Sequence, residues 1–195
     1  HYAKQSYDDV RKWYLTTPSK TPDLKPDADE NHSKGASGGA YLEILPDTRK
    51  NHSERLIHNQ NFTEDPGRMA VLYYPVYFNN AGKYYVWART CPTGSEDNGL
   101  HVGIDGEWPP SGMRMQWLSK NGQWHWDSKQ RTQQVHTGVP YRIYLEVKEP
   151  GLHTIMFSMR EDGFEMDKWL MSTDRDMLKH GDLGVGPDES PLKRR

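Results

Sequence analysis

The chain has 195 residues and a mass of 22.6 kDa, a size typical of one domain that can bury a core without disulfide bridges. Lys and Arg number 25 and Asp and Glu 27, so the formal net charge is −2, which argues against a nucleic-acid binder with a basic surface. No apolar run approaches the ~18 residues of a membrane span. The single cysteine, Cys91, excludes an intramolecular disulfide and a multi-cysteine zinc site, and we expect a buried structural thiol.

The first 34 residues contain few core-forming side chains. Prolines at positions 18, 22 and 26 punctuate polar stretches, and only residues 10–15 hold a small apolar and aromatic cluster. We therefore predict that residues 1–34 form an irregular segment that packs on the domain that follows. Residues 179–195, rich in Gly, Pro and charge, are predicted to be a tail or linker.

Between these ends, residues 35–178 show the two-residue period of β-strands. Turn sequences such as Asn98-Gly99 and Asp105-Gly106 separate the alternating runs. No amphipathic helix competes with this pattern. We predict about nine strands, over residues 41–45, 69–78, 84–89, 100–105, 113–117, 123–127, 143–148, 154–159 and 164–171. Many short antiparallel strands with Gly-rich turns predict an all-β sandwich, specifically a jelly roll.

The aromatic residues suggest a binding surface. Tyr and Trp outnumber Phe 18 to 4, so most of the rings carry a polar group. Trp108, Trp124 and Trp126 stand close together among Gln, His, Asp and Lys residues, whereas Trp87 and Trp117 are expected to fill the core. Because Trp124 and Trp126 point the same way from one strand, they are predicted to form an aromatic wall for the apolar face of a sugar ring.

Polar loops beside these tryptophans are predicted to select the ligand, through Glu96, Asp97, Asn98, Arg160, Glu161 and Asp162. Trp13 and Tyr14 are predicted to fold over the site and complete it. The cations Arg114, Lys129, Arg131 and Arg160 suit sulfate or carboxylate groups of a polymer, and solvated surface cations are the alternative.

Catalysis is the less favoured interpretation of the acidic residues. Glu165 and Asp167 share one face of a strand, which is the spacing of retaining β-sandwich glycosidases. Those enzymes carry a third carboxylate three residues further on, where this chain has Leu170. A jelly-roll glycosidase or lyase would have to draw its acid and base from Glu161, Glu165, His125 and His136. No His-x-His pair is present for a metalloenzyme.

Four strings appear in a familiar order: residues 99–108 (GLHVGIDGEW), 122–126 (GQWHW), 151–155 (GLHTI) and 163–169 (GFEMDKW). Over residues 35–172 the chain resembles non-catalytic carbohydrate-binding modules of the galactose-binding-like β-sandwich type, families six and thirty-five and their malectin-like relatives. This resemblance implies that Trp124 or Trp126 stacks on the sugar and that Glu165 occupies the slot of a ligand-binding Asn. It also implies that Asp167 helps to hold a structural calcium ion.

These inferences together predict non-catalytic binding of a polysaccharide, with a lean toward marine galactans such as agarose or porphyran. The resemblance implies an attached hydrolase or lyase that the module targets to its substrate, and a secreted, periplasmic or cell-surface location. It implies no organic cofactor, no nucleic acid and no membrane partner. Two alternatives stay open: a structural domain that packs against a catalytic neighbour, and a glycosidase or lyase.

Overall fold

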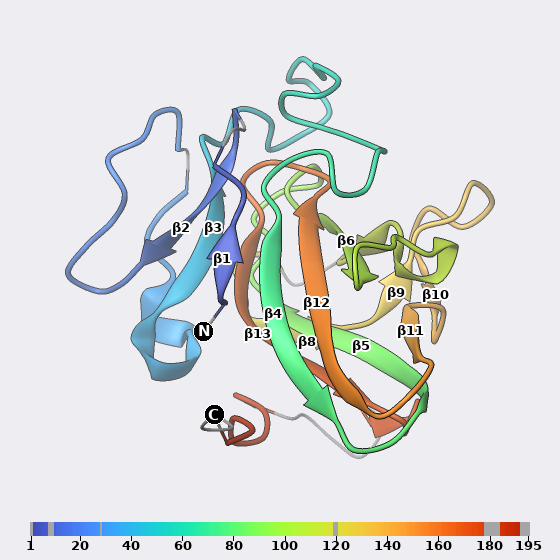
Figure 1. Ribbon diagram of the computed structural model, residues 1–195. Coiled ribbons are helices and arrows are strands. Elements are labelled where there is room, and N and C mark those ends of the chain that lie inside the picture. The colour runs from blue at the N-terminus through green and yellow to red at the C-terminus, as the bar shows by residue number, and fades with distance from the viewer. Residues whose placement is uncertain (1, 8–9, 28, 119–120, 178–183, 192–195) are drawn as a thin grey trace.

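The computed structural model describes residues 2–7, 10–27, 29–118, 121–177 and 184–191. Two antiparallel sheets pack face to face, which confirms the predicted β-sandwich (Figure 1). In the part of the chain described, no helix is long and apolar enough to cross a membrane.

The seven-stranded sheet has the order β1 (Lys4–Gln5), β4 (Leu72–Phe78), β12 (Gly151–Met159), β6 (Gly99–Ile104), β7 (Met115–Gln116), β9 (Lys129–Gln130) and β10 (Val139–Pro140). The six-stranded sheet has the order β11 (Tyr144–Val147), β5 (Gly82–Thr90), β13 (Glu165–Ser172), β3 (Tyr41–Leu45) and β2 (Lys12–Thr16), with β8 (His125–Asp127) also paired to β5. Short 3₁₀ turns occur at η1 (Ser33–Gly35), η2 (Ser37–Gly39) and η3 (Pro110–Gly112).

The core lies between the two sheets and follows from the alternating pattern. In β12, the side chains of Ile155, Phe157 and Met159 are fully buried on the inner face. Trp87 and Trp117 are also buried, as expected for core residues. Burial of each large apolar side chain contributes about 2 kcal/mol, so this layer dominates the stability of the sandwich.

A loop covers part of the outer face of the seven-stranded sheet. The amide of Gly67 donates to Ser158 Oγ at 2.8 Å, and the amide of Thr63 donates to Arg160 O at the same distance. The imidazole of His101, on the outer face of β6, is therefore fully buried. This end of the sheet keeps polar side chains that are shielded from water.

The N-terminal segment is more regular than the sequence predicted. It contributes β1 to one sheet and β2 to the other, with Lys12 opposite Leu45 and Thr16 opposite Tyr41. The sequence pattern did not predict β2, because burial in this strand does not follow hydrophobicity: Leu15 is 56% exposed, whereas Thr16 is fully buried. Pairing with β3, rather than hydrophobic alternation, holds this strand in place.

Candidate functional site

A polar hollow of about 410 Å³ lies at the loop end of the sandwich. Four segments meet there: the stretch before η1 and the loops that follow β3, follow β5 and precede β8. The hollow is lined by Asp29, Glu30, His32, Lys50, Thr93, Asn121 and Gly122. Charged, hydroxyl and amide groups of this kind can exchange hydrogen bonds with a polyhydroxylated ligand.

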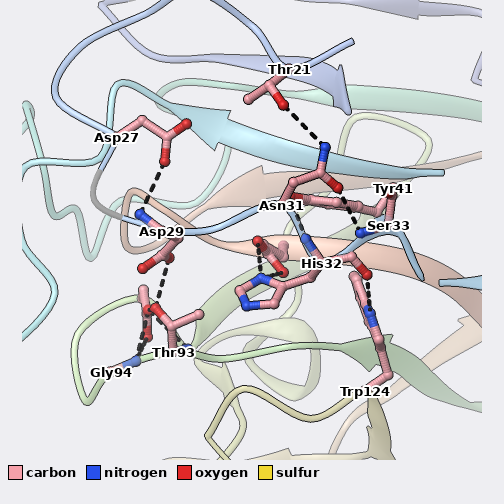
Figure 2. Close-up of polar contacts among 12 residues, drawn as sticks. Thr21, Asp27, Asp29, Asn31, His32, Ser33, Tyr41, Thr93, Gly94 and Trp124 are labelled. Carbon is pink, nitrogen blue, oxygen red and sulfur yellow. Dashed lines mark hydrogen bonds and ion pairs between the residues drawn. The ribbon is translucent and has the colours of Figure 1, made fainter. Parts of the chain in front are cut away.

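Asp29 organises one wall of the polar hollow. Its carboxylate forms an ion pair with the Lys50 ammonium, and the Thr93 hydroxyl lies 2.7 Å from its Oδ2 atom. The amide of Asp29 donates to Asp27 Oδ1 at 3.2 Å (Figure 2). Thr93 is held from behind by Asp97, whose Oδ2 accepts from the Thr93 amide at 3.0 Å. The polar groups of this wall are thus positioned before any ligand arrives.

His32 links the polar hollow to a buried carboxylate. Its Nδ1 atom lies 2.8 Å from Glu165 Oε1 and 3.0 Å from Oε2. Burial raises the pKa of Glu165 to about 7, and the hydrogen bond to Glu165 raises the pKa of His32. The Glu165 carboxyl therefore changes its charge near neutral pH, with the His32 imidazole as its hydrogen-bond partner.

Behind the polar hollow lies a set of carboxylates that could hold a metal ion. Oxygens of Asp29, Glu43 and Glu165 lie within 4.8 Å of one another. Glu43 is 1% exposed and its Oε1 atom has no hydrogen-bond partner among the described residues. Burial, followed by repulsion from Glu165, raises the pKa of Glu43 to about 10. An all-oxygen set of this kind suits a hard cation such as calcium.

Cys91 lies beside the same carboxylates. Its Sγ atom groups with His32 and Glu165 within 4.8 Å. Burial raises the pKa of the Cys91 thiol, which keeps it protonated at neutral pH. The cysteine is buried, as the sequence predicted, and a protonated thiol is a poor metal ligand.

Trp124 and Trp126, predicted to form a wall, are both half-buried, and each ring nitrogen is engaged by the chain itself. Trp124 Nε1 donates to His32 O at 3.0 Å, and a Cβ added at Gly35 would lie 2.6 Å from Trp124 Cδ1. Trp126 Nε1 donates to Gly184 O at 3.1 Å. Trp124 therefore supports one rim of the polar hollow, while Trp126 anchors a C-terminal segment.

The other aromatic residues also lie apart from the polar hollow. Trp13, predicted to be a lid, is buried in the core, and its Nε1 donates to Ala70 O at 2.6 Å. Tyr14 lies in β2 and lines a separate, mainly apolar hollow with Leu15, Lys20, Pro22, Asp23 and Leu24. Trp108 is half-buried against Gly67 and Gly103. Pairing of β2 with β3 fixes Trp13 and Tyr14, so neither folds over the site.

Glu96, Asp97 and Asn98 were predicted to select the ligand from an exposed loop, but all three are buried. Glu96 pairs with Arg49 and with His52, whose Nδ1 lies 2.5 Å from Glu96 Oε1. Asp97 accepts hydrogen bonds from Thr93 and Gly94 and so shapes the polar hollow indirectly. The side-chain amide of Asn98 is buried without a partner among the described residues.

Arg160, Glu161 and Asp162 are likewise internal. Arg160 pairs with Glu161, and both are at most 3% exposed. Asp162 Oδ2 accepts from the Arg11 guanidinium at 2.9 Å and from the Thr48 hydroxyl at 2.7 Å. These residues stabilise the loop before β13 and do not face solvent.

Asp167, predicted to be a calcium ligand, has an arginine as its neighbour. Its Oδ2 atom lies 2.5 Å from Arg89 NH1 and accepts from the Ser37 amide at 3.0 Å. The pairing of β13 with β5 shifts register between Met166 and Lys168, at Asp167. Asp167 is therefore neutralised by Arg89, and the oxygen-rich set around Glu43 fits a cation better.

Sequence reasoning missed the residues that line the polar hollow. Asp29, His32, Lys50 and Thr93 come from loops that are distant in sequence and meet only after the sheets have paired. Of the predicted residues, Asp97, Trp124 and Glu165 do converge there, each in contact with a lining residue. The sequence signal for this hollow was the closely spaced acids Asp27, Asp29 and Glu30.

Residues 27–189 match the family model described as the glycosyl hydrolase family 115 C-terminal domain. The chain belongs to this family. The matched range covers both sheets apart from β1 and β2, and it includes every residue that lines the polar hollow.

Other comparisons place this family 115 C-terminal domain beside one curated protein and several solved structures. It is 50% identical over 173 residues to "Uncharacterized protein P23" of Formosa agariphila, covering 89% of the chain and 42% of that protein. The chain thus spans less than half the length of this relative.

Among solved structures it is similar to CBM35 from Paenibacillus barcinonensis, with 11% identity and a TM-score of 0.47, covering 89% of this chain and 95% of that one. It is also similar to a family 35 carbohydrate-binding module from Clostridium thermocellum, with 17% identity and a TM-score of 0.43, covering 72% and 83%. Both of these similar structures are family 35 carbohydrate-binding modules.

Proposed function

We propose that this domain binds a polysaccharide without catalysis and targets an attached hydrolase or lyase to it. The polar hollow carries this proposal, because the exposed side chains of Glu30 and Asn121 line it while contacts among Asp29, Lys50 and Thr93 hold its wall in place. Preorganised polar groups bind sugars with little loss of side-chain entropy. We propose marine galactans such as agarose or porphyran as the leading substrates and, because such polymers lie outside the cytoplasm, a secreted, periplasmic or cell-surface location.

The state of the acidic residues supports a binding role. Glu161 is 2% exposed and Glu165 is 1% exposed, and each is engaged by a cationic partner, Arg160 and His32 respectively. A glycosidase needs two carboxyl groups that flank the scissile bond of a bound sugar. Buried and paired carboxylates do not meet this need.

An attached catalytic domain is part of the proposal. The family description concerns the C-terminal domain of a glycosyl hydrolase, and the chain covers only 42% of its relative. The same facts suit the second candidate, a structural domain that packs against a catalytic neighbour. The half-buried Trp124 and Trp126, whose ring nitrogens are engaged by the chain itself, argue against a flat aromatic platform.

We also propose calcium as the cation of the buried oxygen-rich set. Asp29, Glu43 and Glu165 would hold it, since Glu43 Oε1 is buried and unpartnered in the described part of the chain. The ion would neutralise these carboxylates and fix Asp29 and His32 at the rim of the polar hollow. Its role would be structural, and no chemical step depends on it.

The proposal is tested by affinity gel electrophoresis of the chain against agarose, porphyran, laminarin, xylan and alginate. We expect retardation by at least one polymer, and no new reducing ends or unsaturated products after incubation. The double variant Glu30→Gln/Asn121→Ala changes two exposed lining residues and should weaken binding about tenfold, the loss expected for about two hydrogen bonds. Glu146→Gln, an exposed change on β11, is the matched control. Absence of retardation by every polymer would favour the structural domain.

A further inference from the structure

A second polar region lies on the outer face of the seven-stranded sheet. Ladder pairing sets Met159 opposite Leu100, and Gly99 opposite Gln116. Arg160 therefore extends across Gly99, where a Cβ would lie 2.9 Å from the Arg160 NH1 atom. The absence of a side chain at Gly99 makes room for the guanidinium at this end of the sheet.

Two more arginines join Arg160 at this end. The amide of Arg131 donates to Arg114 O at 2.8 Å, which continues the pairing of β7 with β9. Like charges opposite one another on neighbouring strands are destabilising. Burial, then the charges of Arg160 and Arg114, lower the pKa of Arg131. Three cations thus occupy one end of the sheet, and we call Arg114, Arg131 and Arg160 the arginine cluster.

The donors of the arginine cluster are incompletely used. The Nε atoms of all three arginines are buried and have no hydrogen-bond partner among the described residues. Arg160 pairs with Glu161, and Arg114 has only a distant partner, Glu64, at 3.7 Å. For Arg131 the neighbours are neutral oxygens at long range: Gln116 Oε1 at 3.5 Å and His136 O at 3.4 Å. Glu64, Glu96 and Glu161 partly balance the charge of the cluster, and its least engaged donor is the Arg131 NH1 group, which meets only neutral oxygens at long range.

The backbone of Arg114 is held in an unfavourable conformation. Its φ angle is +59°, in the left-handed region that residues other than glycine rarely adopt. The Arg114 amide donates to His101 Nδ1 at 3.1 Å, and His101 Nε2 lies 3.3 Å from Thr63 O. Burial lowers the pKa of His101 to about 3, so the ring is neutral, accepts at Nδ1 and donates at Nε2. A neutral histidine and a strained backbone thus aim Arg114, as is common at binding sites.

We propose that Arg114 and Arg131, backed by Arg160, bind a sulfate ester of the polysaccharide. A guanidinium fork binds tetrahedral oxyanions through two parallel hydrogen bonds, and a sulfate ester keeps its charge throughout the physiological pH range. Arg114 and Arg131 are partly exposed, so a surface ligand can reach them, whereas Arg160 lies beneath. The proposal rests on the polysaccharide-binding function above and narrows its substrate class to sulfated polymers.

One segment connects the arginine cluster with the polar hollow. Thr93 lines the hollow, and Gly99 begins β6 beneath Arg160, with only five residues between them. Glu96 in this segment is near enough to Arg131 to affect its pKa. A polymer of several sugars can therefore place hydroxyls at the hollow and a sulfate at the cluster.

The test compares porphyran, which carries sulfate esters, with chemically desulfated porphyran, agarose and alginate, by affinity gel electrophoresis at low and high salt. We expect Arg131→Gln to weaken porphyran binding about tenfold, the loss of one charge-assisted hydrogen bond, and to reduce the salt dependence. Arg131→Lys should recover part of the affinity. Arg55→Gln, an exposed arginine outside the cluster, is the matched control and should bind like the unmodified chain.

The outcomes separate this inference from the function on which it rests. Binding to agarose and desulfated porphyran with the same affinity as porphyran would overturn the sulfate site and leave polysaccharide binding intact. Equal binding to alginate would assign the cluster to carboxylates and overturn the choice of sulfate. Unchanged porphyran binding by a folded Arg131→Gln variant would also overturn it. No binding to any polymer would contradict the proposed function itself.

Discussion

Two polar regions of this sandwich carry opposite charge imbalances. At the loop end, the buried carboxylates of Asp29, Glu43 and Glu165 crowd together, and the unpartnered oxygen of Glu43 faces them. On the outer face of the seven-stranded sheet, the three guanidinium groups of the arginine cluster crowd together with unpartnered Nε atoms. The acidic region holds three carboxylates beside the two partners Lys50 and His32, and the basic region holds three guanidinium groups beside Glu64 and Glu161.

The difference indicates two kinds of ligand on one small domain. Burying an uncompensated charge costs several kcal/mol, so without a cation Glu43 keeps a proton, in line with its raised pKa, and a bound cation would replace that proton. The acidic set is nearly inaccessible, which suits a resident ion, whereas Arg114 and Arg131 are partly exposed, which suits a ligand that comes and goes. The predictions that follow test whether the two regions behave as opposites.

Calcium should produce the largest effect, and only through the acidic region. Saturating calcium should raise the thermal midpoint by about 6–10 °C, the shift for an ion at about 100 times its Kd in a domain of this size. Glu43→Gln should abolish the shift, because it removes the unpartnered buried carboxylate oxygen. Differential scanning fluorimetry with calcium and with a chelator measures this. A full calcium response in Glu43→Gln, with Arg55→Gln as control, would remove the proposed cation site.

The pH dependence of stability should come second. In the folded chain burial raises the pKa of Glu43 to about 10, of Asp47 to about 8 and of Glu165 to about 7. Each folded-state value lies above that of the unfolded chain, so the folded state holds these protons more tightly and loses stability as pH rises above about 4.5. The raised pKa of His32 acts in the same direction.

Without calcium, the free energy of unfolding should therefore fall by about 1 kcal/mol per pH unit for each carboxyl group still protonated in the folded chain, from about pH 5 up to about pH 7 for Glu165 and about pH 8 for Asp47. Urea denaturation at a series of pH values measures this slope. Glu43→Gln should flatten the slope, and calcium should flatten it in the unmodified chain. Stability that rises over this window would contradict the burial of uncompensated carboxylates.

The smallest effect should come from the arginine cluster, with the opposite sign. Removing a partner from a buried ion pair destabilises a protein, but removing one of several repelling cations does not. Arg131→Gln should leave the midpoint unchanged or raise it by up to about 2 °C. A marked loss of stability in Arg131→Gln, beyond that of Arg55→Gln, would mean that Arg131 is a structural residue.

The sequence predicted the fold well because the relevant signal is local. In β12, for example, Ile155, Phe157 and Met159 alternate with residues of the other face. Several such two-residue alternations, separated by Gly-rich turns, are enough to predict a β-sandwich. The sequence did not predict β2 because burial there runs against hydrophobicity. Thr16, at the end of the strand, and Arg11, just before it, are buried, whereas Leu15 is exposed. Only pairing with β3 explains that inversion, and pairing is non-local.

The site was harder to predict for the same physical reason. A strand position indicates that Trp124 and Trp126 point the same way, but not that His32 and Gly184 lie against their ring nitrogens. Charged loop residues such as Asp162 were expected at the surface, yet ion pairing with Arg11 lets them be buried. Residue types suggest sugar chemistry, while the convergence of loops decides which residues are accessible.

The central claim, that a polysaccharide occupies the polar hollow, is tested most directly by tryptophan emission during titration with a polymer that retards the chain. Trp124 donates to His32 at the rim of the hollow, whereas Trp126 donates to Gly184. We predict a saturable change in emission that Trp124→Phe removes and Trp126→Phe preserves. An emission that stays constant while the polymer is bound, or a change that survives in Trp124→Phe, would contradict the account.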